Sequence, residues 1–298
     1  MIIKITASCR LHYQKLGFVM PVNSTKTNFK WLIHPLLVVI VGSAFTIHAS
    51  AGTLISATDY LEYELPQSIQ DECYERSNCP NIEVKYLNTN QNWIDNIVNA
   101  RINNIIVYDQ SRQAPIDMTT NSDLVKMAID TFVKSQFEDL PDDVPWSYQL
   151  MVTPEYLGHV KLGRVQSGQN EDLELFEISS YIFTGGAHGM PTSEYLIFDP
   201  NTKAQIKLAD MLEQGQKPYF EALAYDAYKE WVKTVDDDIS SYEESWPFML
   251  SDNITLTDKG MDIRYQHYDI GPYAYGMPVL SIPYNKLNGI IKPNFLPK

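Results

Sequence analysis

Strand-like and helix-like patterns occur in separate runs along this chain, and this order constrains the fold more than any other feature. Apolar residues recur at three- and four-residue steps over 94–106 and again over 124–137, which predicts two amphipathic helices in the N-terminal half. One long helix is predicted in the C-terminal half, from Pro218 to Val235, since proline suits a first helical turn. Separate runs favour an α+β fold with a mainly antiparallel sheet.

The other periodic segments have the patterns of strands. Residues 82–87 alternate apolar and charged side chains, as a half-buried strand does. The sequence Asp-Pro-Asn-Thr at 199–202 predicts a hairpin turn, and Thr153-Pro154 is expected to separate two strands. The predicted strands are 53–65, 82–87, 146–152, 156–165, 173–183, 195–198, 205–208, 254–257, 261–266 and 277–282, followed by a short helical turn from Tyr284.

The N-terminal segment has the features of a secretory signal peptide. Lys26 and Lys30 precede an uncharged apolar run at 36–47, and Ala-Ser-Ala at 49–51 offers a cleavage site. The run is short for a membrane span, which needs about 20 apolar residues. We therefore expect a periplasmic or secreted protein, whereas an uncleaved segment would be a single N-terminal membrane anchor.

These observations suggest three parts. Residues 1–51 form the signal segment, with Met20 as a candidate true start because a more ordinary signal peptide begins there. Residues 52–180 form an N-terminal half and residues 181–298 a C-terminal half. We find no internal repeat and no low-complexity linker between the halves.

Every acidic residue lies after the signal segment. The chain has 37 Asp and Glu against 23 Lys and Arg, a net charge of −14, and residues 1–51 hold five of the basic residues, so the remainder carries −19. Such a surface repels nucleic acid and anionic lipid headgroups, and it attracts a cationic partner mainly by raising the encounter rate. Solubility alone would also explain it. We expect no nucleic-acid partner, and membrane contact only through an uncleaved signal segment.

The number of cysteines after the signal segment is consistent with an exported protein. Cys9 lies in the signal segment, which leaves Cys73 and Cys79 in the mature chain. An even pair in an oxidising compartment predicts a disulfide. The spacing is too long for a Cys-x-x-Cys redox or zinc motif, so we expect a local structural staple.

The sequence contains no common catalytic motif: no Gly-x-Ser-x-Gly, no His-Glu-x-x-His, no P-loop and no dinucleotide fingerprint. The histidines of the mature chain, His159, His188 and His267, are far apart in the sequence, so a zinc site would require folding to bring them together. The acidic runs lack the ligand spacing that calcium loops need. We predict no cofactor and no metal.

Two segments are richer in signals for binding. Gly185 and Gly186 follow a predicted strand, where they allow positive φ and close backbone approach, and His188 comes next. Pro272, Tyr273 and Tyr275 crowd a glycine-bounded segment, and exposed tyrosines on rigid loops are typical binding anchors. The predicted ligand-binding residues are Gly185, Gly186, His188, Pro272, Tyr273 and Tyr275. A tight turn alone would also explain the two glycines and His188.

Four segments occur together in one known family. They are the Gly-Gly-Ala-His loop at 185–188, the hairpin at 199–208, the strand-turn pair at 256–263 and the Pro-Tyr-x-x-Gly loop at 272–276. In this order they resemble the extracytoplasmic domain of RsiV-type anti-sigma factors, which is also present in PdaC-type peptidoglycan deacetylases. The resemblance is firmest over 181–291 and extends more weakly back to about residue 53. It implies an α+β fold.

The resemblance also implies a function. The RsiV-type domain binds lysozyme, and this chain shows no evident sigma-binding module or deacetylase domain, so the ligand-binding module alone is implied. We therefore expect an envelope-located, non-enzymatic protein that binds lysozyme or another cationic envelope protein. The alternative is a cell-wall or carbohydrate-modifying hydrolase, in which His188 would act together with a carboxylate such as Asp199 or Asp269.

Overall fold

The computed structural model divides the chain into two units, Met1–His48 and Ala49–Lys298, and describes parts of the second. The described residues are 55, 58–62, 64, 67–68, 70–71, 81–106, 130, 149–162, 172–183 and 186–297. The signal segment, Cys73, Cys79, Gly185 and all but one residue of the predicted helix at 124–137 lie outside them, so the expectations on these residues stay predictions. Every helix in the described part is too short or too polar to cross a membrane.

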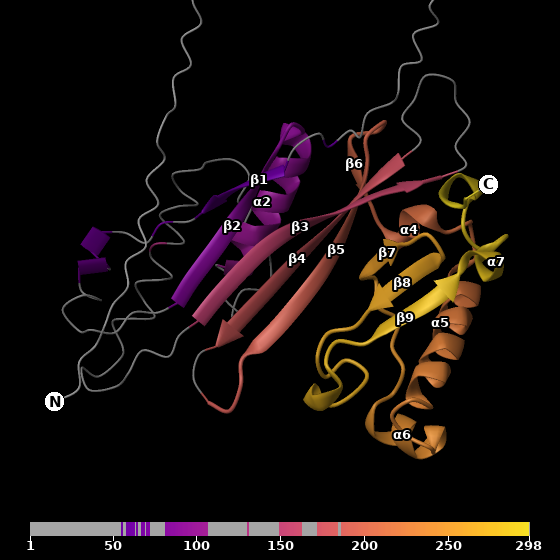
Figure 1. The fold of residues 1–298 in the computed structure, drawn as a ribbon. Helices are drawn as coiled ribbons and strands as arrows, with labels where there is room; N and C mark the ends of the chain where they lie inside the picture. Colours follow the sequence, from indigo (N-terminus) through magenta and orange to yellow (C-terminus); the bar gives the residue numbers. More distant parts are fainter. Residues whose placement is uncertain are drawn as a thin grey trace, which may run out of the picture. The chain divides into compact units, whose positions relative to one another are not determined.

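Six strands form one sheet in chain order, β1 to β6 (Figure 1). β2 and β3 run parallel, and the other neighbouring pairs are antiparallel. The strands are β1 Thr58–Glu62, β2 Asn81–Thr89, β3 Gln149–Lys161, β4 Asp172–Phe183, β5 Met190–Asp199 and β6 Ala204–Ile206. The sheet is mainly antiparallel, which confirms the α+β class, and β4 crosses the boundary between the two predicted halves.

β3 runs through Thr153 and Pro154 without a break, so the strand boundary predicted there is wrong. β4 pairs with β3 along its whole length, whereas β2 pairs only with residues 149–152. Pro154 therefore lies where β2 requires no N–H from β3, and strands tolerate proline at such positions. The actual irregularity comes later, because the register shifts between Tyr156 and Gly158, whose φ is +108°.

One face of this sheet is covered by helix α2 (Asn92–Ile106), which matches the first predicted helix (Figure 1). The side-chain amide of Asn99 ties α2 to β2, accepting the Leu87 N–H at 2.7 Å and donating to the Leu87 carbonyl at 2.8 Å. The core on this side contains residues of α2 and of β2 to β5: Ile94, Val98, Ile102, Ile106, Val84, Val152, Phe176 and Phe198.

A second sheet is built from three antiparallel strands in the order β7–β8–β9, and it packs against helix α5. The elements are α4 Leu208–Met211, α5 Lys217–Val232, α6 Ile239–Ser245, β7 Ile254–Leu256, β8 Gly260–Arg264, β9 Val279–Pro283 and α7 Tyr284–Leu287. α5 is the predicted long helix, with Pro218 in its first turn. Two short helices were not expected: α4 follows β6, which ends at Ile206 instead of 208, and α6 is capped by Asp238, which accepts the Ser241 N–H.

Alternating side chains on β4 and β5 belong to two different cores. Phe176 and Phe198 pack toward α2, whereas Leu175 and Ile197 pack toward the three-stranded sheet and α5. β5 is therefore the strand on which the two sheets meet. The residues just before β5, and those that connect β8 to β9, form the region that carries the predicted binding residues.

Candidate functional site

Two loops that are distant in the sequence are joined by Tyr273. One loop is residues 186–189 before β5, and the other is residues 265–278 between β8 and β9; we call them together the loop pair. The Tyr273 hydroxyl donates to the Gly189 carbonyl at 3.0 Å. A Cβ on Gly189 would lie 2.3 Å from the Tyr181 ring, so any larger residue at this position would displace that ring. The structure thus brings His188 and the aromatic loop together.

Tyr273 is stacked between two histidine rings. The centroid of its ring lies 3.8 Å from that of His188 and 4.3 Å from that of His267, and both pairs are within 22° of parallel. Two rings cannot share one face of a tyrosine at these distances, so the histidines occupy opposite faces. Tyr273 is partly buried and acts as the connection between the loops.

His188 is an exposed residue whose hydrogen-bonding partners are neutral. Its Nδ1 is 3.0 Å from the Gly189 carbonyl oxygen, which only accepts, so Nδ1 carries the hydrogen. Its Nε2 then accepts a long hydrogen bond of 3.5 Å from the Tyr268 hydroxyl. Within the described residues no carboxylate bonds to this ring. The ring is therefore fixed in one orientation without the acidic partner that a general base would use.

Tyr268 has an unusual backbone. Its φ is +68°, one of two non-glycine residues with positive φ in the described chain, and such conformations are strained for large side chains. Its side chain is 45% exposed and lies 6.5 Å, centroid to centroid, from Trp246 in a stacked arrangement. The fold therefore presents this tyrosine to solvent at some cost in backbone energy.

Tyr275 lies further along the same loop and is 41% exposed. Its ring meets Trp231 of α5 edge to face at 6.3 Å. Behind it, Tyr242 of α6 donates to the Ile270 carbonyl at 3.0 Å. A Cβ on Gly271 would lie 2.7 Å from the Tyr242 hydroxyl, so the loop and α6 approach as closely as glycine allows. Both exposed tyrosines thus stand on an immobilised loop.

Exposed carboxylates occur on α6 and on the connection that joins it to α5, and both helices contact this loop. Asp236, Asp237 and Glu244, from the α5–α6 connection and α6, are exposed. Burial, with smaller effects from Tyr275 and Asp236, raises the pKa of Tyr242 to about 12. Asp236 is therefore close enough to act electrostatically on the tyrosine that packs under the loop.

The carboxylates proposed as catalytic partners of His188 do not form an acid–base pair with it. Asp199 ends β5 while His188 precedes its start, and ten strand residues span about 30 Å, so the pairing with Asp199 is wrong. Asp269 lies in the loop pair, but its Oδ2 accepts the Gln266 N–H at 2.6 Å and closes a turn. In the described part of the chain no group of three His, Cys, Asp or Glu side chains is placed to hold a metal ion.

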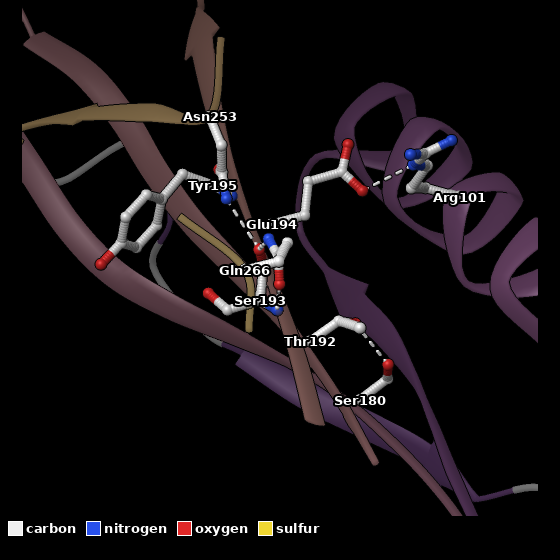
Figure 2. A network of polar contacts seen from close by, with 8 residues as sticks. All are labelled: Arg101, Ser180, Thr192, Ser193, Glu194, Tyr195, Asn253 and Gln266. Atoms are coloured by element: carbon white, nitrogen blue, oxygen red, sulfur yellow. Dashed lines mark hydrogen bonds and ion pairs between the residues drawn. The ribbon is translucent and has the colours of Figure 1, made fainter. Parts of the chain in front are cut away.

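A second polar network lies further along β5 (Figure 2). The Gln266 side chain accepts the Ser193 N–H at 3.1 Å and donates to the Ser193 carbonyl at 2.6 Å. The Asn253 side chain accepts the Tyr195 N–H at 2.7 Å and donates to the same Ser193 carbonyl at 2.7 Å. Two side-chain amides thus make the bonds that a neighbouring strand would make with the edge of β5.

One buried acid was not expected from the sequence. Glu174 of β4 is 0% exposed, and its Oε2 accepts the Tyr156 hydroxyl at 2.6 Å. Burial raises the pKa of this carboxyl and so favours the neutral acid. Alternation with Leu173 and Leu175 in the sequence is typical of an outward-facing residue, so no sequence signal marks Glu174 as buried. It packs on the α2 side and belongs to the core.

Comparisons with known proteins agree with this fold. Residues 197–285 match the family model described as "Protein of unknown function (DUF3298)", and they lie within the predicted C-terminal half. A DUF3298 family protein from Pseudomonas aeruginosa PAO1 has a crystal structure that is similar with a TM-score of 0.58 and 28% identity, covering 81% of this chain and 97% of that one. The crystal structure of a DUF3298 family member from Bacteroides fragilis NCTC 9343 is similar with a TM-score of 0.58 and 17% identity. The similarity covers 81% of this chain and 96% of that one. No curated protein matches the chain.

Proposed function

We propose that this chain is an envelope-located, non-enzymatic binding protein, whose loop pair recognises a cationic cell-wall-associated protein such as lysozyme. The observation that carries the proposal is the exposure of Tyr268 and Tyr275, at 45% and 41%, on a loop held by the stacked rings of His188, Tyr273 and His267. Tyrosines on a pre-ordered loop lose little conformational entropy on binding, so they serve well as anchors.

The charges beside the loop favour a basic partner. Asp236, Asp237 and Glu244 are exposed on α6 and on the connection before it, and α6 packs against the loop through Tyr242; the chain after residue 51 carries all 37 acidic residues. Opposite charges raise the association rate and exclude acidic competitors. Arginine and lysine side chains can also stack on tyrosine rings. A cationic protein surface therefore fits both the aromatic and the acidic groups.

The resemblance to RsiV-type domains, which bind lysozyme, supports the same kind of partner. Two of its four segments, the Gly-Gly-Ala-His loop and the Pro-Tyr-x-x-Gly loop, contribute His188 and Tyr273 to one contact, so the features that carry the resemblance lie at the proposed binding face. Export through the signal segment, with cleavage after residue 51, would deliver the domain to the compartment in which lysozyme acts. We prefer binding to hydrolysis because the partners of His188 are neutral.

The test is a titration of the purified protein with lysozyme by surface plasmon resonance at several salt concentrations. We expect binding whose association rate falls steeply as salt rises, because screening weakens the attraction between exposed charges. Tyr275→Ala should weaken binding by about 2 kcal/mol, while the thermal midpoint changes little.

Tyr219 provides the matched control. It is 63% exposed at the start of α5, away from the loop pair, so Tyr219→Ala should bind like the unchanged protein. No binding at low salt and tens of micromolar protein would exclude lysozyme as the ligand. Equal losses from Tyr219→Ala and Tyr275→Ala would show that the loop pair is not the binding face.

A further inference from the structure

A cavity of about 570 Å³ lies beside β5, close to the point where β6 ends. β6 pairs only with residues 197–199 of β5, so among the described strands none continues along this edge toward Met190. The cavity is bounded by α2, by β5, by the start of α4 and by the segment around Asn253. Its volume is typical of pockets for small ligands.

One wall of the cavity is built to bond peptide-like groups. Asn253 and Gln266 both line it, and both already bond the β5 backbone through their side-chain amides (Figure 2). Each side-chain amide has two N–H donors, of which a single one is used on the Ser193 carbonyl. The remaining donors are of the kind that a peptide carbonyl accepts.

Charged groups of both signs border the same cavity. Arg101 of α2 bonds Glu194 through its Nε, at 2.6 Å, and within the described residues its two terminal nitrogens make no bond, so they retain their donors. Lys207 and Asp252 also line the cavity, and neither forms an ion pair with another described residue. A free guanidinium edge is suited to a carboxylate, and the carboxylates Glu194 and Asp252 are suited to an ammonium group.

We propose that this cavity is a second binding site, for a short peptide with free termini, whose C-terminal carboxylate is bound by Arg101. The peptide amides would meet the side-chain amides of Asn253 and Gln266, and its ammonium group would face Asp252. The proposal rests on the β5 edge and uses Gln266 of the loop pair but neither of its exposed tyrosines, so it can be tested separately from lysozyme binding.

The test is a titration of the purified protein with trialanine, followed by nuclear magnetic resonance, in parallel with trialanine amide. We expect trialanine to bind, and the amide to bind about tenfold more weakly because the charged hydrogen bond to Arg101 is lost. Arg101→Gln should weaken trialanine about tenfold and leave the amide unchanged, so the two ligands become equal.

Lys217→Gln is the control, since Lys217 is an exposed lysine at the start of α5 outside the cavity, and it should preserve the preference for trialanine. A circular dichroism melt of each variant checks that it is folded. The proposal is wrong if trialanine causes no shifts up to roughly 10 mM, or if acid and amide bind equally to the unchanged protein. Lysozyme binding should be the same with and without trialanine.

Discussion

Two of the contacts, or junctions, between the part of the chain that carries the small sheet and the strand β5 or its preceding loop are made of different groups. At the start of β5 the junction consists of rings, with Tyr273 between His188 and His267. Further along, it consists of the side-chain amides of Asn253 and Gln266. We call these the ring junction and the amide junction.

The two junctions differ in what they contribute: the amide junction stabilises the fold, and the ring junction holds exposed tyrosines in place for a binding partner. The amide junction satisfies backbone groups that would otherwise have no bond at a sheet edge, and such groups are costly when buried. The ring junction makes one short hydrogen bond between the two loops, from Tyr273 to Gly189, and one long one, from Tyr268 to His188, and otherwise uses ring faces. It therefore leaves neighbouring tyrosines free to meet a partner. We expect the amide junction to matter most for folding and the ring junction most for binding.

The largest effect is expected at the amide junction. Asn253→Ala removes bonds to the Tyr195 N–H and the Ser193 carbonyl at once, and should lower the free energy of unfolding by about 3 kcal/mol. Urea denaturation measures this. Asn285→Ala, at an exposed position of α7, should change it by less than about 0.5 kcal/mol. Similar values for both variants would mean that water replaces the Asn253 amide without loss.

The ring junction should be weaker. Tyr273→Ala loses both ring stacks and the bond to Gly189, and should cost about 2 kcal/mol in unfolding free energy. Tyr273→Phe keeps the rings and should cost about 1 kcal/mol. If both variants keep full stability and lose lysozyme binding, Tyr273 is an anchor for the partner and not a connection between loops.

The regular elements could be predicted from the sequence because their cause is local. α2 and α5 follow from apolar steps of three and four residues, and the β5–β6 hairpin follows from its turn residues. Pro154 was misread as a break because proline's missing N–H matters only where a strand needs it. Which edge of β3 lacks a partner is decided by the whole sheet.

The site was predictable only in part. His188, Pro272, Tyr273 and Tyr275 come from loops that the structure does bring together, and their glycines and aromatic residues were visible signals. Tyr268 could not be identified from the sequence, because no local sequence pattern predicts positive φ for a tyrosine. The amide junction was equally hidden, because an isolated Asn or Gln has no periodicity and its partner is a strand far away in the sequence.

A smaller effect is expected at Gly186, which begins the described part of its loop with a φ of +99°. A Cβ there meets nothing within 4 Å, so any cost comes from backbone strain and not from a clash. Gly186→Ala should lower the unfolding free energy by about 1.5 kcal/mol, as measured in urea. Ala187→Ser in the same turn should be nearly neutral, and a neutral Gly186→Ala would show that this loop relaxes easily.

The smallest expected effect is the difference in stability between two variants of Tyr268, which measures the backbone strain at this residue. Tyr268→Ala and Tyr268→Gly both remove the ring that stacks on Trp246, so they lose the same contacts. They differ in backbone preference, because glycine adopts the φ of +68° readily and alanine does not. Tyr268→Gly should therefore be more stable than Tyr268→Ala by about 1 kcal/mol, although glycine also gains entropy when unfolded. Both variants should bind lysozyme about equally weakly, since the anchor is absent from each. If Tyr268→Ala is the more stable of the two, the backbone is not strained at this position, and the exposure of the tyrosine costs the fold nothing.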